Sequence, residues 1–187
     1  GTPLPIYAST AQTSFDFRSS TCLGRIGDLD GDDADDFVAG AIDPIAAQFT
    51  PVVVSGATGA ILQRGFSPSI FEGVGHAVDG AVDFDGDGTL DFAASSPGTT
   101  VGVVVVYSGA TGHALQTWWP AQPGNRFGRY MRCGGNDFDQ DGIPDVVVGQ
   151  ALLSQALILS GRDGSTLYRV EKSGPFQTSL GTYVAVM

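Results

Sequence analysis

Short runs of Val, Ala, Leu and aromatic residues recur along the chain, and stretches rich in Gly, Asp and Ser separate them. The run Val103–Tyr107 is a clear example, because it is flanked by Gly102 and by Ser108-Gly109. Apolar runs this short and this rich in β-branched residues predict strands rather than helices. Gly and Asp in between suit tight turns. We therefore expect an all-β chain of many short strands.

The strands are expected in a repeating order of four. A first strand opens with an apolar residue and Gly, an acidic loop leads to the second, and a hairpin turn joins the third to the fourth. In chain order, the opening pairs are Val74-Gly75, Phe127-Gly128 and Leu180-Gly181, and the second strands are 37–40, 92–95 and 146–149. The third strands with their turns are 52–59, 104–112 and 157–164, and the fourth strands are 60–63, 114–117 and 166–169. Four strands in roughly fifty residues are typical of a β-propeller blade.

The repeats define the expected organisation of the chain. The predicted units are a partial blade (outer strand) at 1–17, repeats at 18–69, 70–122 and 123–174, and a partial blade (inner strand) at 175–187. Closed propellers need about four to eight blades. Three units cannot close alone, so we expect residues 5–8, which resemble a fourth strand, and 180–186, which resemble a first, to pair with another copy or with a longer parent chain.

Three acidic loops join the first and second strands of the repeats, and 14 of the 18 Asp residues fall within them. Each loop places aspartates at positions one, three, five and nine. These are Asp28, Asp30, Asp32 and Asp36 in the first loop, Asp83, Asp85, Asp87 and Asp91 in the second, and Asp137, Asp139, Asp141 and Asp145 in the third. Hard divalent cations, above all calcium, take six to eight oxygen ligands, which alternate aspartates on a tight turn can supply.

Two other kinds of structure contain acidic loops of this type. An EF-hand needs Glu at position twelve on a following helix, whereas position twelve is Ala39, Ala94 or Val148, each in an apolar run. Turns capped by Asp without metal are the second alternative, but four close carboxylates without a cation would repel one another. Position six is Gly88 or Gly142 in two loops, which favours positive φ, and Asp33 in the first, at some cost.

The order Phe127-Gly128, Asp137-x-Asp139-x-Asp141-Gly-x-x-Asp145, Val147-Val-Gly149 resembles the FG-GAP repeat of integrin alpha-subunit propellers and of bacterial secreted proteins. The resemblance extends over all three units. It implies about three Ca²⁺ ions, one per repeat, each held by the four aspartates and by the backbone carbonyl at position seven. Those position-seven residues are Ala34, Thr89 and Ile143. The sequence departs from the family pattern at Val74-Gly75 and at Leu23-Gly24.

Charge and composition narrow the functions further. The net charge of −11 argues against nucleic acid or an anionic membrane surface as a partner. No apolar run reaches transmembrane length. The chain begins at Gly1 without an initiator Met, so we expect a processed product or a piece of a longer protein. Calcium sites suit the high free calcium outside the cytosol, so a secreted or cell-surface location is expected.

From the remaining reactive side chains we expect that the protein is not an enzyme. No nucleophile motif, phosphate-binding glycine loop or zinc cluster is present. His76 and His113 are interpreted as packing or surface residues, and Cys22 and Cys133 as buried thiols too far apart to bridge. Trp118 and Trp119 suit either a sugar-stacking platform or, as we favour, the contact between adjacent blades.

Two classes of function remain at this point. The first is an extracellular calcium-binding propeller module that binds a protein or glycan. The second is a calcium-stabilised structural subunit whose edge strands assemble copies of the chain into a ring or an extracellular filament. An accessory domain of a secreted hydrolase or lyase is a weaker third alternative.

Overall fold

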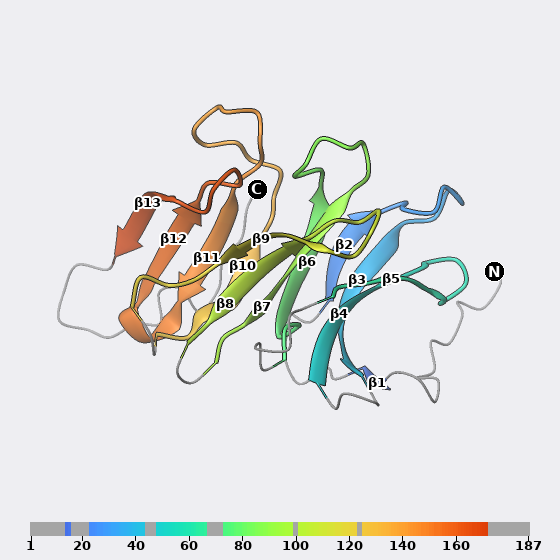
Figure 1. Ribbon diagram of the computed structural model, residues 1–187, viewed down its shortest axis with the longest axis horizontal. Helices are drawn as coiled ribbons and strands as arrows, with labels where there is room; N and C mark the ends of the chain where they lie inside the picture. Colours follow the sequence, from blue (N-terminus) through green and yellow to red (C-terminus); the bar gives the residue numbers. More distant parts are fainter. Residues whose placement is uncertain are drawn as a thin grey trace, which may run out of the picture.

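Three antiparallel sheets lie side by side in the computed structural model, which describes residues 14–15, 23–43, 48–66, 73–98, 101–122 and 125–171 (Figure 1). The first sheet contains β1 (Ser14–Phe15), β2 (Leu23–Gly27), β3 (Asp36–Asp43), β4 (Gln48–Val54) and β5 (Ile61–Arg64). The second contains β6 (Ala77–Val82), β7 (Asp91–Ser96), β8 (Val103–Tyr107) and β9 (Ala114–Trp118). The third contains β10 (Phe127–Arg132), β11 (Val146–Gln150), β12 (Gln155–Leu159) and β13 (Thr166–Glu171), with the short 3₁₀ helix η1 (Ala151–Leu153) before β12.

The expected all-β class and the four-stranded units are confirmed. In the second and third sheets the strands are paired in chain order, β6-β7-β8-β9 and β10-β11-β12-β13. Position twelve of each acidic loop lies on a strand, within β3, β7 or β11, so the EF-hand reading is excluded. The strands expected at 5–8 and 180–186 lie outside the described residues.

The pairing of β1 was not expected from the sequence. Ser14 and Phe15 pair with Ile42 and Ala41 at the end of β3, while β2 pairs with the earlier residues of the same strand. The edge of β3 is therefore shared by two separate segments. The first sheet is five-stranded for this reason.

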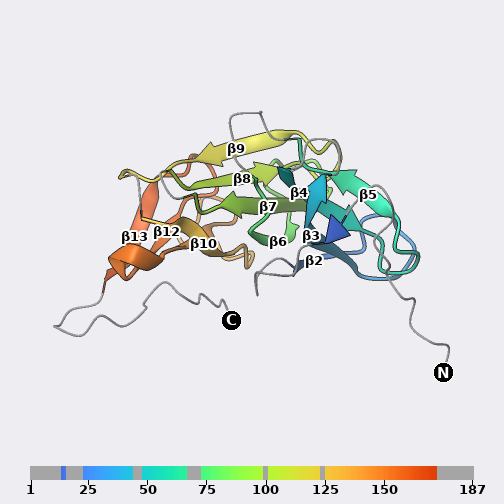
Figure 2. The same ribbon diagram turned by 90° about the horizontal axis from the view of Figure 1, so that it is seen from below.

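The sheets form a fan, with β2, β6 and β10 toward its centre and β5, β9 and β13 along its outside (Figure 2). Glycine lets the central strands approach closely, because a Cβ on Gly24 would lie 2.7 Å from the Cα atom of Asp79 in β6. Between the first two sheets, Ile26, Val38 and Val53 pack in one buried cluster with residues of the second sheet. This packing fixes the spacing of neighbouring sheets.

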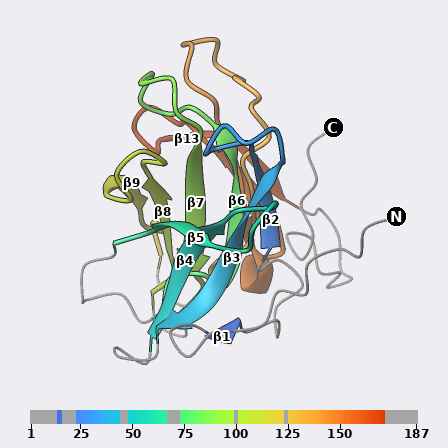
Figure 3. The same ribbon diagram turned by 90° about the vertical axis from the view of Figure 1, so that its right-hand side faces the viewer.

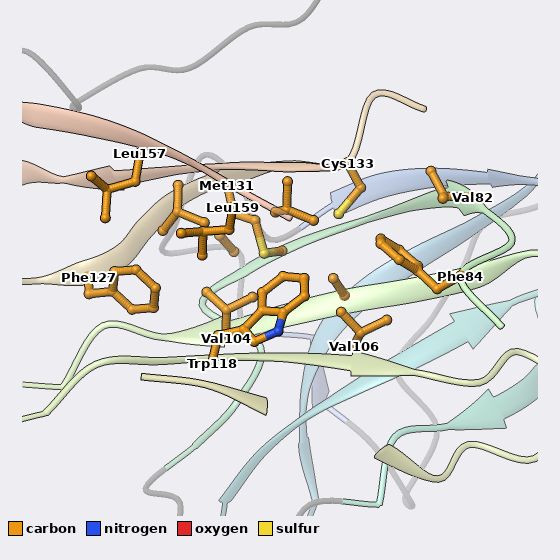
Figure 4. Packing of buried hydrophobic residues seen from close by; sticks show 14 residues of the cluster. Val82, Phe84, Val104, Val106, Trp118, Phe127, Met131, Cys133, Leu157 and Leu159 are labelled. Carbon is orange, nitrogen blue, oxygen red and sulfur yellow. The ribbon is translucent and has the colours of Figure 1, made fainter. Parts of the chain in front are cut away.

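The core between the second and third sheets is built mainly from aliphatic side chains around one tryptophan (Figure 4). Trp118 is buried there with Val104, Met131 and Leu157, as the blade-contact reading predicted. Its neighbour Trp119 is 50% exposed, so the prediction of a buried contact between blades is confirmed for Trp118 alone. Cys133 is a buried free thiol in the same core, as expected, and Cys22 lies outside the described residues.

Glutamines on the fourth strands tie each sheet to the next hairpin. Gln63 on β5 donates through Nε2 to the carbonyl of Ala110 at 3.2 Å, and Gln116 on β9 donates to the carbonyl of Arg162 at 3.1 Å. In the third sheet the corresponding position is Tyr168, which pairs with Ile158 as Gln116 pairs with Val106. Tyr168 is 54% exposed.

The face of the third sheet that points away from the second carries exposed apolar side chains. Val146 and Val148 are buried toward the second sheet, so Val147, Ile158 and Tyr168 point the other way because side chains alternate along a strand. Phe138 and Val170 are also exposed among the described residues. We call the surface formed by Phe138, Tyr168 and Val170 the outer face of the third sheet.

Candidate metal centre

The three acidic loops lie at the same end of the sheets (top of Figures 1 and 3). Each connects the first strand of a sheet to the second, as predicted. They occupy residues 28–35 between β2 and β3, 83–90 between β6 and β7, and 133–145 between β10 and β11. The repeated topology therefore places three similar clusters of carboxylates on one edge of the fan.

The aspartate at position one organises the turn of each loop. In the second loop, Asp83 accepts the N–H of Gly86 through Oδ1 at 2.7 Å and that of Gly88 through Oδ2 at 3.0 Å. Asp28 and Asp137 accept the position-six N–H in the same way, at 2.9 and 2.8 Å. A turn that aims several N–H groups at one carboxylate needs positive φ at position six. The values there are 69° for Asp33 and 86° for both Gly88 and Gly142, as the sequence predicted.

The aspartate at position nine is buried in all three loops and joins the loop to the hairpin of its own sheet. One oxygen accepts the N–H at position two and the other accepts the N–H of the hairpin glycine. Asp36 accepts the N–H of Leu29 at 2.7 Å and that of Gly56 at 2.9 Å. Asp91 accepts those of Phe84 and Gly109, both at 2.8 Å. Asp145 accepts that of Phe138 at 2.6 Å and that of Gly161 at 3.0 Å. We call this arrangement the aspartate clamp. Since each carboxylate oxygen has two lone pairs, the clamp leaves acceptor capacity for a cation.

The hairpin glycine is required by the clamp. A Cβ on Gly56, Gly109 or Gly161 would lie 1.9 Å from the carbonyl oxygen at position eight of the loop, which belongs to Asp35, Leu90 or Pro144. No other residue type allows the hairpin to approach the loop this closely. The recurrent Ser-Gly pair in the sequence is thus the partner of the acidic loop, a relationship that the sequence did not reveal.

Carboxylate oxygens come together in each loop, but with different members. Groups whose oxygen atoms lie within 4.8 Å of one another are Asp83 with Asp85 and Asp91, Asp137 with Asp139 and Asp145, and Asp28 with Asp30 and Asp32. Positions one, three and nine are therefore grouped in the second and third loops, and positions one, three and five in the first. Among the described residues no other three His, Cys, Asp or Glu side chains lie this close.

The other expected ligands lie beside these groups. Asp87, Asp141 and Asp36 belong to the loops but not to the groups of closest oxygens. The residue at position seven donates its N–H to the position-five carboxylate in each loop. These contacts join Ala34 to Asp32 at 2.9 Å, Thr89 to Asp87 at 2.7 Å, and Ile143 to Asp141 at 2.8 Å. The position-seven carbonyls remain predicted ligands.

The electrostatics of the loops favour the arrival of positive charge. Burial raises the pKa of Asp91 to about 6, and the charges of Asp85 and Asp83 act in the same direction, while the N–H groups of Gly109 and Phe84 oppose the rise. The pKa values of Asp30 and Asp139 are also raised, through desolvation and the neighbouring aspartates. A bound divalent cation would relieve this repulsion and keep the carboxylates ionised.

Two arginines pair with loop aspartates. Arg25 contacts Asp35, at position eight of the first loop, through Nη2 at 3.1 Å. Arg162 contacts Asp141, at position five of the third loop, through Nε at 2.6 Å. Both pairs are at the surface, and neither was expected from the sequence, because each joins residues that only the folded sheet brings together.

The histidines do not form a joint site. His76 is partly buried, and its pKa is lowered by burial and by the charge of Arg129. His113 is exposed, and its ring lies 5.5 Å from that of Phe66 between centroids. These positions agree with packing and surface roles. No helix in the described part of the chain is long and apolar enough to cross a membrane.

A cavity of about 400 Å³ lies between the third sheet and the segment that follows β9, and the end of β11 remote from the acidic loop contributes Gln150 to its wall. Trp119 and Phe127 line it together with Gln150, Gln155 and Glu171. Gln150 and Gln155 are buried, pair across β11 and β12, and share a side-chain hydrogen bond. In the second sheet the corresponding pair is Ser96 and Val103. The amide pair is therefore particular to this cavity.

Comparisons with known proteins agree with this architecture. Residues 83–148 match the FG-GAP-like repeat family, a segment that runs from the second acidic loop through the third, so the resemblance noted in the sequence is confirmed for this segment. No curated protein sequence matches the chain.

One of two solved structures is similar enough to identify the type of fold. The Dos1 propeller resembles this chain with a TM-score of 0.52 and 12% sequence identity, over 81% of this chain and 35% of that chain. BamB from Moraxella catarrhalis has a TM-score of 0.37 and 15% identity, over 88% of this chain and 54% of that chain. The chain thus spans about a third of the Dos1 propeller chain. At this identity the likeness to Dos1 establishes a propeller-type fold and nothing about function.

Proposed function

We propose that this chain, which carries an FG-GAP-like repeat on a propeller-type fold, is an extracellular calcium-binding module for interaction with a protein or a glycan. The observation that carries the proposal is the threefold recurrence of one loop, with the same aspartate clamp, at one end of the three sheets. Acidic residues that served only to keep the surface soluble would not recur at the same positions of each repeat. The module has no catalytic role in this proposal.

The donor set suits calcium better than other common metals. Every candidate ligand is a carboxylate or a backbone carbonyl, and hard oxygen donors favour Ca²⁺ and Mg²⁺ over Zn²⁺, which is usually held by Cys and His. Calcium tolerates irregular geometry, whereas Mg²⁺ demands a near-ideal octahedron. The three groups differ in their members, which favours the more tolerant ion. About three ions per chain would bring the formal charge from −11 to about −5.

The glycan part of the proposal is supported by the cavity beside Trp119. A half-exposed indole offers a face for the C–H groups of a sugar ring. The amides of Gln150 and Gln155 offer donors and acceptors for hydroxyl groups. The volume of about 400 Å³ falls in the range of small-molecule sites. A protein ligand would instead use the loops on one face of the fan.

Thermal unfolding tests the calcium proposal. The melting temperature should rise when calcium replaces a chelator, because calcium binds the folded loops and finds no comparable site in the unfolded chain. At a hundredfold excess over the dissociation constant, each independent site adds about 2.7 kcal/mol. Magnesium at the same concentration serves as the control and should give a smaller rise. Equal melting temperatures with chelator and with calcium would refute the proposal.

A second candidate function is favoured by the outer face of the third sheet. Phe138, Tyr168 and Val170 are 39%, 54% and 51% exposed, and apolar patches on sheets are typical of interfaces. In this alternative, calcium-stabilised copies of the chain assemble into a ring or filament. Light scattering distinguishes the two: a monomer in calcium refutes assembly, whereas large species that Tyr168→Lys disperses would support it.

A further inference from the structure

In the third acidic loop, one of the expected calcium ligands is already paired with a cation that belongs to the chain itself. Arg162 donates through Nε to Oδ2 of Asp141 at 2.6 Å and through Nη2 to the carbonyl oxygen of Asp141 at 3.0 Å. The same hairpin position is occupied by Ala57 in the first repeat and by Ala110 in the second. Only the third hairpin can therefore place a side-chain charge on its loop.

We propose that Arg162 is a built-in competitor for the calcium ion of the third loop, so that this loop binds calcium more weakly than it would with the alanine of the other repeats. The inference rests on the proposed calcium function and adds a regulatory feature to it. Calcium that takes Asp141 as its position-five ligand must share this carboxylate with the guanidinium or displace it. The third site then fills at higher calcium than its own carboxylates would require.

The electrostatics of the third loop fit this role. The guanidinium of Arg162 lies 2.6 Å from Oδ2 of Asp141, so it offsets the negative charge of one expected ligand before any metal ion binds. Because a guanidinium and a divalent cation at one carboxylate repel, the ion pair opposes binding of the ion.

The arginine of the first loop provides an internal contrast. Arg25 pairs with Asp35, which stands at position eight and is not among the expected ligands. Among the described residues, no ion pair involves an aspartate of the second loop. Competition for a ligand is therefore confined to Asp141.

The geometry also allows Arg162 to be substituted without disturbing the backbone of the hairpin. Its backbone is held independently of its side chain, because its carbonyl accepts Gln116 Nε2 at 3.1 Å and the hairpin glycine Gly161 is held by Asp145 at 3.0 Å. The Arg162 side chain is exposed. Truncation should leave the hairpin in place and change the loop through charge alone.

The test measures calcium affinity at the third loop alone. In a background of Asp30→Asn and Asp85→Asn, which weakens the first two loops at exposed positions, calcium is titrated by calorimetry into the chain with and without Arg162→Ala. We expect Arg162→Ala to tighten binding about fivefold, the upper effect of one exposed ion pair. Arg162→Lys should give a smaller change, because it keeps the charge but loses the two-pronged contact. Arg25→Ala is the matched control and should leave this affinity unchanged.

Thermal unfolding gives a second readout. In chelator, Arg162→Ala should lower the melting temperature, because the loop loses its only neutralising charge, and the rise produced by calcium should become larger. Unchanged affinity, or weaker binding in Arg162→Ala, would overturn the inference; weaker binding would mean that Arg162 instead orients Asp141 toward the ion. If the first two loops of the unaltered chain bind calcium while Arg162→Ala has no effect, only this inference fails. If no loop binds calcium, the proposed function fails first.

Discussion

The buried carboxylate of Asp91 accepts the backbone N–H of Gly109 at 2.8 Å, across 18 residues of sequence. This bond joins the acidic loop of the second sheet to the hairpin that connects its third and fourth strands. Asp36 and Asp145 make the same bond to Gly56 and Gly161. The position-nine aspartate therefore has a structural role in the sheet in addition to any role as a ligand.

Gly109→Ala should strongly destabilise the fold. The added Cβ would lie 1.9 Å from the carbonyl oxygen of Leu90, so the hairpin must move away from the loop and Asp91 must lose its partner. Overpacking of this kind costs about 3 kcal/mol, measured as the free energy of unfolding in denaturant with calcium present. Ala110→Gly at the next, exposed turn position is the control and should cost much less. Equal stability of Gly109→Ala and the unaltered chain would contradict the clamp.

Substitutions of the aspartates at positions five and nine should distinguish a role as a calcium ligand from a role in the aspartate clamp. Asp91→Asn replaces one acceptor oxygen by a donor, which then faces a buried N–H, so it should cost about 1–3 kcal/mol even in chelator. Asp87→Asn changes an exposed residue and should have little effect in chelator but reduce the stabilisation by calcium. Denaturant unfolding of both variants, with and without calcium, checks this. If both variants lose stability equally in chelator, the two positions do not have distinct roles.

The pH dependence of stability should change sign with calcium. In the calcium-free protein the pKa of Asp91 is raised to about 6, above its value in the unfolded chain, so the folded state binds this proton more tightly. Its contribution is fully present below about pH 4 and is lost as the pH rises through about 6. With saturating calcium, protons compete with the metal, and stability should rise over the same interval. Melting temperatures across this range in chelator and in calcium test both slopes; a rise with pH in chelator would contradict the assignment.

The sequence predicted the features that recur and missed those that depend on contact between distant segments. The spacing of Asp28, Asp83 and Asp137 was enough to place three loops between first and second strands. Strand positions followed from local patterns, because short β-branched runs between turn residues have few alternatives. β1, with only Ser14 and Phe15, has no pattern that a sequence could reveal.

Within the site, the pairing of Arg162 with Asp141 and the need for Gly109 depend on how closely the hairpin approaches the loop. No local pattern encodes that distance. Trp118 and Trp119 illustrate the same limit: alternation along a strand predicts that one is buried and the other exposed, but the register that decides between them is set by the neighbouring sheet. The carboxylates that come together also differ between loops, although the spacing of the aspartates in the sequence is the same in all three.

The most direct test of the account is the number of calcium ions that the chain binds, measured by calorimetric titration of the metal-free protein. We expect about three ions per chain. In a variant with Asp28→Asn, Asp83→Asn and Asp137→Asn, which alters position one of every loop, binding should be lost or greatly weakened. Absence of calcium binding by the unaltered chain, or an unchanged number of ions in the triple variant, would contradict the central claim that the three acidic loops are calcium sites.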